Sequence, residues 1–133
     1  MKESEEKYRS LVEANIVGII LVNMNYVVEA NDAFLKIVGF IRQDLEDGKI
    51  NWRDLTPPEY ASIDDKAVSD ILEHGRCEPF EKEYFRKDGS RVPVLIGASM
   101  VRRLPFECSC FVMDITQNKK SLLGESFQNL FNE

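Results

Sequence analysis

The sequence predicts an α+β domain, built from a five-stranded antiparallel sheet with helices packed on one face and flanked by an N-terminal helix. The order of segments points to this fold, because two short strand-like runs precede several short helical ones and a three-strand meander follows. The Asp88-Gly89 pair lies between two runs rich in aromatic and β-branched residues, and Asp-Gly readily supplies the positive φ angles of a tight hairpin turn. The length of 133 residues suits one domain with one core.

A charged segment near the N-terminus, residues 2–15, is the first helix candidate. Its apolar residues include Tyr8, Leu11 and Val12, whose spacing is that of one helix face. The apolar stripe is narrow. We therefore expect this flanking helix, over residues 1–17, to pack outside the main core.

Two short strands come next, at residues 18–22 and 26–30, with residues 23–25 as a hairpin loop. A helix follows them, because Asn31 is a good N-cap and Gly39 is a ready C-terminal stop.

The middle of the chain is less regular and holds the longest predicted helix. Residues 41–47 are interpreted as one helical turn. Thr56 and Glu59 have the spacing of a capping box, with proline at the first helical position. This pattern predicts a helix with an apolar face that ends near His74 and Gly75.

The C-terminal half predicts the three-strand meander. Residues 80–101 form a hairpin in this interpretation, and residues 111–115 form the last strand after a break at residues 104–106.

Charge and hydropathy exclude several classes of protein. The net charge of −6 is moderate and the basic residues are scattered among acidic ones, so no nucleic-acid footprint is present. The longest apolar run, residues 16–22, is far shorter than the ~20 residues of a membrane span, and the first residues are too acidic for a signal peptide. We expect no direct membrane insertion and a cytoplasmic location, either as a free protein or as the cytoplasmic part of a membrane-anchored one.

The three cysteines, Cys77, Cys108 and Cys110, are an odd number without a CxxC spacing. This pattern indicates a reducing compartment and argues against a disulfide framework or a structural zinc site, so no metal site is predicted. We interpret the thiols as small buried strand residues, and a redox or metal role is the alternative.

A series of short segments stands out along the chain, at residues 6–11, 19–22, 29–34, 51–60, 78–84, 86–90 and 114–116. In this order and with these gaps, the segments resemble the PAS family of sensory domains. The resemblance covers about residues 6–120 and implies a PAS core, with its PAC motif, over residues 18–116. It implies a small binding or relay module, found mostly in bacterial signalling proteins such as sensor histidine kinases and commonly dimeric. Residues 107–110 depart from the family pattern, which places small or apolar residues there.

Residues 117–133 are expected to form an outgoing helix or linker. Within them, residues 125–131 echo residues 6–12, with a glutamate, an aromatic residue and a leucine at matching steps. We interpret this echo as the start of a second PAS unit, and the alternative is a plain amphipathic helix.

A pocket is expected between the helices and the inner face of the sheet. Its candidate residues are nearly all apolar, so a core filled by side chains is the alternative. The polar groups expected to orient a ligand are Asn31, Ser99 and the hydroxyl of Tyr84, and with so few of them a charged metabolite is not expected. The pocket candidates are Phe34, Ile37, Leu45, Trp52, Val68, Ile71, Tyr84, Ile96, Met100, Phe111 and Met113.

The resemblance also bears on cofactors. Haem-binding PAS domains usually place a histidine in the middle of the long helix, where this chain has residues 63–66, and its single histidine, His74, is expected on the surface at the helix end. Blue-light domains of the LOV type use an Asn-Cys-Arg motif for a flavin adduct, and the matching residues here are Asn51, Trp52 and Arg53. Tryptophan has no thiol, so neither haem nor a LOV-type adduct is expected, whereas a non-covalent flavin remains open. In the alternative interpretation Trp52 simply fills the pocket.

The resemblance implies a sensory and relay role. In this family the residues that close the last strand, here Asp114, Ile115 and Thr116, couple the sheet to the following helix. We predict that they pass a signal from a small apolar or cofactor ligand to a downstream effector in the same chain, of the histidine kinase type. The alternative is a ligand-free dimerisation and relay domain with a filled core, and we expect a homodimer through the N-terminal helix.

No sequence feature points to an enzyme. The chain has no glycine-rich phosphate loop, no GxSxG motif, no metal-spaced cluster and no sensibly placed Cys/His pair.

Overall fold

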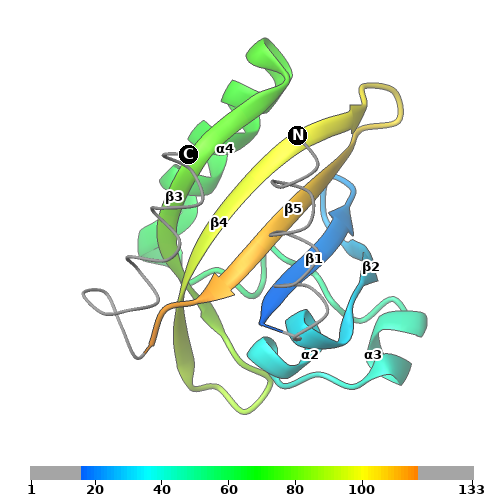
Figure 1. The fold of residues 1–133 in the computed structure, drawn as a ribbon, viewed down its shortest axis with the longest axis vertical. Coiled ribbons are helices and arrows are strands. Elements are labelled where there is room, and N and C mark those ends of the chain that lie inside the picture. The colour runs from blue at the N-terminus through cyan, green and yellow to red at the C-terminus, as the bar shows by residue number, and fades with distance from the viewer. Residues whose placement is uncertain (1–15, 117–133) are drawn as a thin grey trace, which may run out of the picture.

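The structure, a computed structural model, describes residues 16–116 and contains the predicted five-stranded antiparallel sheet with helices on one face (Figure 1). The strand order is β2-β1-β5-β4-β3. In chain order the elements are β1 (Val17–Val22), β2 (Val27–Ala30), α2 (Asp32–Val38), α3 (Arg42–Glu46), η1 (Pro58–Tyr60), α4 (Ala61–His74), β3 (Arg76–Phe85), β4 (Arg91–Arg102) and β5 (Glu107–Asp114).

The two flanking predictions lie almost entirely outside the described residues. The helix predicted for residues 1–17 is wrong at its last two residues, because Ile16 is not helical and Val17 begins β1. The first 15 residues of that helix, and the outgoing segment or second unit predicted for residues 117–133, are not among the residues described.

Strand alternation builds the inner face of the sheet. On β4, Val92, Val94 and Ile96 are buried at alternate positions, and β5 repeats the pattern with Cys110 and Val112. Successive side chains of a strand point to opposite faces. One face therefore packs on the helices, with α4 along β3, α2 against β1 and α3 beside β2 (Figure 1).

The first helix is held to β1 by Asn31, whose side chain makes three hydrogen bonds. Its Oδ1 accepts from the N–H of Phe34, as the predicted N-cap, and also from the N–H of Ile19, while its Nδ2 donates to the carbonyl oxygen of Val17. A Cβ on Gly18 would lie 3.0 Å from the Cα and Cβ of Phe34, so this glycine permits the close approach of α2. The amide of Asn31 thus joins a helix end to a strand.

The meander is confirmed, and its strands are longer than predicted. β3 begins at Arg76, because Cys77 pairs with Ala98 and the ladder continues past a register shift that accommodates Pro79. β5 begins at Glu107, since Cys108 and Cys110 pair regularly with β1. The departure from the family pattern at residues 107–110 therefore does not disturb this pairing.

The capping box predicted for Thr56 and Glu59 is wrong. Neither side chain caps a helix, because the Thr56 hydroxyl is used in a buried cluster and Glu59 pairs with the exposed Arg91. The helix end is as predicted, since Gly75 adopts a left-handed conformation at φ 84° and donates its N–H to the carbonyl oxygen of Ile71.

Within residues 16–116, no helix combines the length and the apolar character needed to cross a bilayer.

Replacing Asn31 with alanine should lower the free energy of unfolding by ~1–3 kcal/mol, because the cap and the ties to β1 are lost together. Asp32→Ala is the matched control, since it removes a neighbouring exposed carboxylate that pairs with Arg42 and should cost under ~1 kcal/mol. Urea unfolding followed by circular dichroism measures both variants. Equal losses in the two variants would contradict the structural role of Asn31.

Candidate ligand cavity

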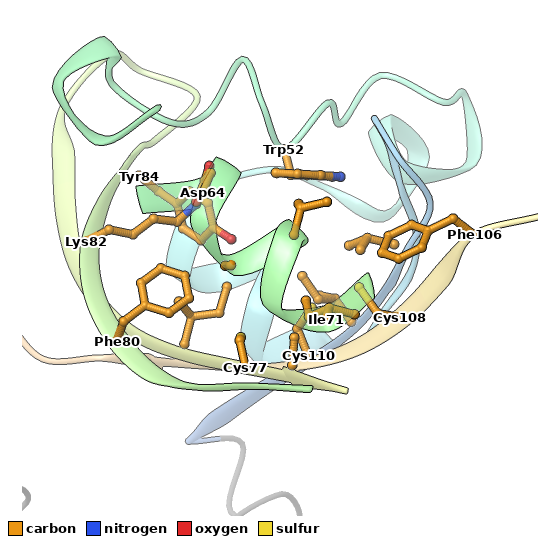
Figure 2. A pocket seen from close by; sticks show the side chains of 16 residues that line it. Trp52, Asp64, Ile71, Cys77, Phe80, Lys82, Tyr84, Phe106, Cys108 and Cys110 are labelled. Atoms are coloured by element: carbon orange, nitrogen blue, oxygen red, sulfur yellow. The ribbon is translucent and has the colours of Figure 1, made fainter. Parts of the chain in front are cut away.

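A cavity of about 50 Å³ lies between α4 and the inner face of β1, β5, β4 and β3 (Figure 2). It exists because small side chains face one another across it, with Ala67 on the helix and Ala98, Cys77 and Cys110 on the sheet. Its lining residues are Ile20, Val22, Trp52, Asp64, Ala67, Val68, Ile71, Cys77, Phe80, Lys82, Tyr84, Ile96, Ala98, Phe106, Cys108 and Cys110.

One end of this cavity carries a buried ion pair. Lys82 Nζ lies 2.7 Å from Asp64 Oδ1, and their side chains are only 1% and 7% exposed. Lys82 Nζ also donates to Thr56 Oγ1 at 2.9 Å. The Thr56 hydroxyl lies 2.8 Å from Asp64 Oδ2 and 3.1 Å from the carbonyl oxygen of Trp52, and donates its single proton to one of them at a time. We call Lys82, Asp64 and Thr56 the buried cluster.

Aromatic rings surround the ammonium of the buried cluster. Lys82 Nζ lies 4.5 Å from the ring centroid of Tyr84 and 6.0 Å from that of Trp52. Burial lowers the pKa of Lys82, and the charge and hydrogen bond of Asp64 oppose that shift. Burial likewise raises the pKa of the Tyr84 phenol well above its ordinary value. The polar end of the cavity is therefore a desolvated ion pair held by hydrogen bonds and aromatic faces.

Sequence reasoning missed the buried cluster, although a periodic signal was available. Asp64 shares the helix face of Ala67 and Ile71, at the spacing of the apolar stripe. Lys82 alternates with Phe80 and Tyr84 along β3 and so points to the inner face. A charged residue at an inward position of each element was the sign that the two could pair.

Five of the predicted pocket residues line the cavity, and the others lie elsewhere. The residues that line it are Trp52, Val68, Ile71, Tyr84 and Ile96. Phe34 is in the core with its ring edge-on to Tyr84, and Ile37, Leu45 and Met100 pack against the same core.

Three predicted site residues face the opposite side of the sheet. Phe111, Met113 and Ser99 alternate with inward residues such as Cys110 and Val112, so their side chains point away from the cavity. Asn31 also lies outside the lining, because its amide is used in holding α2 to β1. Of the three residues whose polar groups were predicted to orient a ligand, only Tyr84 lines the cavity.

The indole of Trp52 covers one side of the cavity (Figure 2). Its Nε1 donates to the carbonyl oxygen of Asn23 at 3.0 Å, and the guanidinium of Arg53 lies 4.5 Å from the ring centroid. The indole is thus anchored from the loop after β1.

His74 is exposed at the end of α4, as predicted.

The three cysteines gather at the cavity, all free and buried, as predicted. The thiols of Cys108 and Cys110 interact on one face of β5; this hydrogen bond lowers the pKa of Cys108, whereas the same bond and burial raise the pKa of Cys110. Burial raises the pKa of Cys77. In the described part of the chain, no group of three or more His, Cys, Asp or Glu side chains is arranged to hold a metal ion.

The predicted coupling residues form a local turn at the end of β5. Asp114 Oδ1 accepts from the backbone N–H of Thr116 at 2.8 Å and from its hydroxyl at 2.5 Å. The N–H of Ile115 donates to the carbonyl oxygen of Pro93. This arrangement holds the chain at the point where it leaves the sheet.

Lys82→Met alone should lower the free energy of unfolding by ~3–5 kcal/mol, because it leaves the Asp64 carboxylate buried without its partner. Adding Asp64→Asn should recover more than half of that loss. Lys66→Met, in the exposed Lys66–Asp70 pair on the same helix, is the control and should change stability by less than ~1 kcal/mol. Denaturant unfolding measures all three variants, and a double variant no more stable than the single one would contradict this account.

The sequence is similar to parts of two larger signalling proteins. It is 36% identical over 118 residues to a hybrid signal transduction protein, dokA, from Dictyostelium discoideum, covering 88% of this chain and 7% of that protein. It is 27% identical over 123 residues to the sensor histidine kinase TmoS from Ectopseudomonas mendocina, covering 89% of this chain and 12% of that protein. The chain therefore spans only a small part of the length of these relatives.

The fold is similar to that of a solved LOV protein. A LOV protein from Rhodobacter sphaeroides matches with a TM-score of 0.67 and 20% sequence identity, over 97% of this chain and 76% of that one. A family model described as PAS domain matches residues 16–117, which is most of the sequence and takes in every described strand and helix. The chain belongs to the PAS domain family.

Proposed function

We propose that this chain is a sensory input and relay domain that binds a small, mainly apolar ligand in the cavity between α4 and the sheet. The observation that carries the proposal is an apolar cavity with one charged cluster at its end. Ligand sites of this kind combine an apolar lining with a few placed polar groups. The relatives are signalling proteins, which supports an input role for the domain.

Size limits the ligand to a small molecule. Pockets for drug-sized ligands occupy ~300–1,000 Å³, whereas this cavity holds about 50 Å³. A flavin ring system does not fit this space, and the anchored indole of Trp52 covers one side of it. The residues present therefore do not suit the non-covalent flavin that the sequence left open, although a LOV protein shares the fold.

A route for the signal runs along β5. Cys108 and Cys110 line the cavity, and the same strand ends at Asp114. Strain placed on β5 by a ligand would reach the turn between Asp114 and Thr116 without leaving the strand. We propose that this junction transmits the signal to an effector of the histidine kinase type in the same polypeptide, with dimerisation through the N-terminal segment.

A second candidate function is a ligand-free relay domain. Two observations favour it: the volume of the cavity is small, and the buried indole of Trp52 covers one side of it. In that case the inner face of the sheet would transmit a change imposed from the flanking segments.

Filling the cavity should abolish ligand retention. Ala98→Val adds bulk on the inner face of β4, whereas Ser99→Val, one residue further, adds bulk on the opposite face and is the matched control. We expect mass spectrometry of the material released on denaturation to detect a small molecule from the wild type and from Ser99→Val, but not from Ala98→Val. Absence of any released molecule from the wild type would favour the ligand-free relay.

Asp114→Ala should uncouple input from output in a signalling protein that carries this domain upstream of its effector. The variant loses the two hydrogen bonds from Thr116 and should retain ligand affinity, because Asp114 does not line the cavity. Glu107→Ala, at the other end of β5, is the control. Effector activity with and without ligand measures the coupling, and an unchanged response in Asp114→Ala would argue against this junction.

A further inference from the structure

We infer that the cavity selects a neutral ligand with a hydrogen-bond acceptor oxygen, such as a small ketone or amide, and that Lys82 is the donor that recognises it. This inference rests on the proposed function and specifies the chemistry of its ligand.

Lys82 can donate one more hydrogen bond than it makes to oxygen atoms of the protein. An ammonium carries three N–H bonds. Two are directed to oxygen acceptors, Asp64 Oδ1 at 2.7 Å and Thr56 Oγ1 at 2.9 Å. Among the described residues, no third oxygen or nitrogen acceptor bonds this ammonium, and what lies nearby is the ring face of Tyr84. An aromatic face is a weaker acceptor than a carbonyl oxygen, so a ligand oxygen would improve the solvation of the ammonium.

The charges that line the cavity balance each other. Asp64 and Lys82 are the charged residues of its lining, and they neutralise each other. A carboxylate ligand would leave a net negative charge in an apolar enclosure, which is strongly unfavourable. A cation would meet a carboxylate whose charge Lys82 already balances, and the ammonium 2.7 Å from Asp64 Oδ1 would repel it. The pair therefore favours a neutral ligand over either charged form.

The cavity is polar at one end and apolar at the other. Asp64 and Lys82 lie at one end of the cavity, and Phe106 and Cys108 lie at the opposite end (Figure 2). The rest of the lining is mainly apolar and includes Ile20 and Ile96 on the sheet. A volume of about 50 Å³ admits about four water-sized groups. A ligand of that size would satisfy both ends of the cavity if its oxygen accepted a hydrogen bond from Lys82 and its carbon atoms lay toward Phe106.

The test uses three probes of the same shape: acetone, isobutene and acetate. Trp52 is the single tryptophan and lines the cavity, so its indole N–H signal in a nitrogen-15 NMR titration of the 133-residue chain reports occupancy. Comparing acetone with isobutene in each variant cancels the difference in hydration between the two probes. We expect the acetone-to-isobutene affinity ratio to fall by ~10-fold or more in the Lys82→Met, Asp64→Asn double variant.

Matched controls make the result specific to the buried pair. The Lys66→Met, Asp70→Asn variant removes an exposed pair on α4 by the same two substitutions and should leave the affinity ratio unchanged. In the wild type, acetate should bind at least ~10-fold more weakly than acetone, a comparison that holds even if the double variant fails to fold.

The outcomes separate this inference from the proposed function. A ratio that stays within twofold in a folded double variant, or tighter binding of acetate than of acetone, would overturn the role of Lys82 while leaving a ligand-binding cavity in place. If none of the three probes shifts the Trp52 signal, both the neutral-acceptor inference and the ligand-binding function fall, and the ligand-free relay takes their place.

Discussion

The buried cluster of Lys82, Asp64 and Thr56 is the interaction on which the arrangement around the cavity depends. It joins β3, α4 and the loop before η1, through contacts between residues 8 to 26 positions apart in the sequence. A buried ion pair is tolerated only when its remaining donors and acceptors are hydrogen-bonded, and removing one partner leaves a costly unpaired charge. The position of α4 on the sheet is therefore set by polar geometry as well as by apolar packing.

The cavity follows from that constraint. With α4 held at Asp64, the next turns of the helix present Ala67 and Ile71 to a part of the sheet where Ala98 and Cys110 are small. Close packing is the norm in protein interiors, so an unfilled space beside a charged pair invites a functional interpretation. A sensory domain needs such a space next to an element that can carry the response, and β5 both lines the cavity and ends at the turn of Asp114 with Thr116.

The other end of the sheet is organised by a different contact. Asn31 caps α2 and bonds β1, and Gly18 lets the helix approach the strand closely. These contacts keep Phe34 in the core, where its ring meets Tyr84 edge-on without lining the cavity itself. The domain thus combines a closely packed region around α2 with a less densely packed one under α4.

The sequence by itself determined the sheet and the order of its strands and helices, because turn residues, caps and apolar periods act locally. The family was identified from the resemblance of short segments, in their order along the chain, to PAS domains. Gly89 and Gly75 mark a turn and a helix end by backbone conformation alone, and both occur where predicted. Only the tertiary structure decided the site. Asp64 and Lys82 gain their partners when α4 packs on β3, and a one-residue step along a strand decides whether a side chain such as Ser99 faces the cavity or the other side. The periodic pattern places both charged residues on the inner faces of their elements, but only the packing of α4 on β3 decides that these two meet.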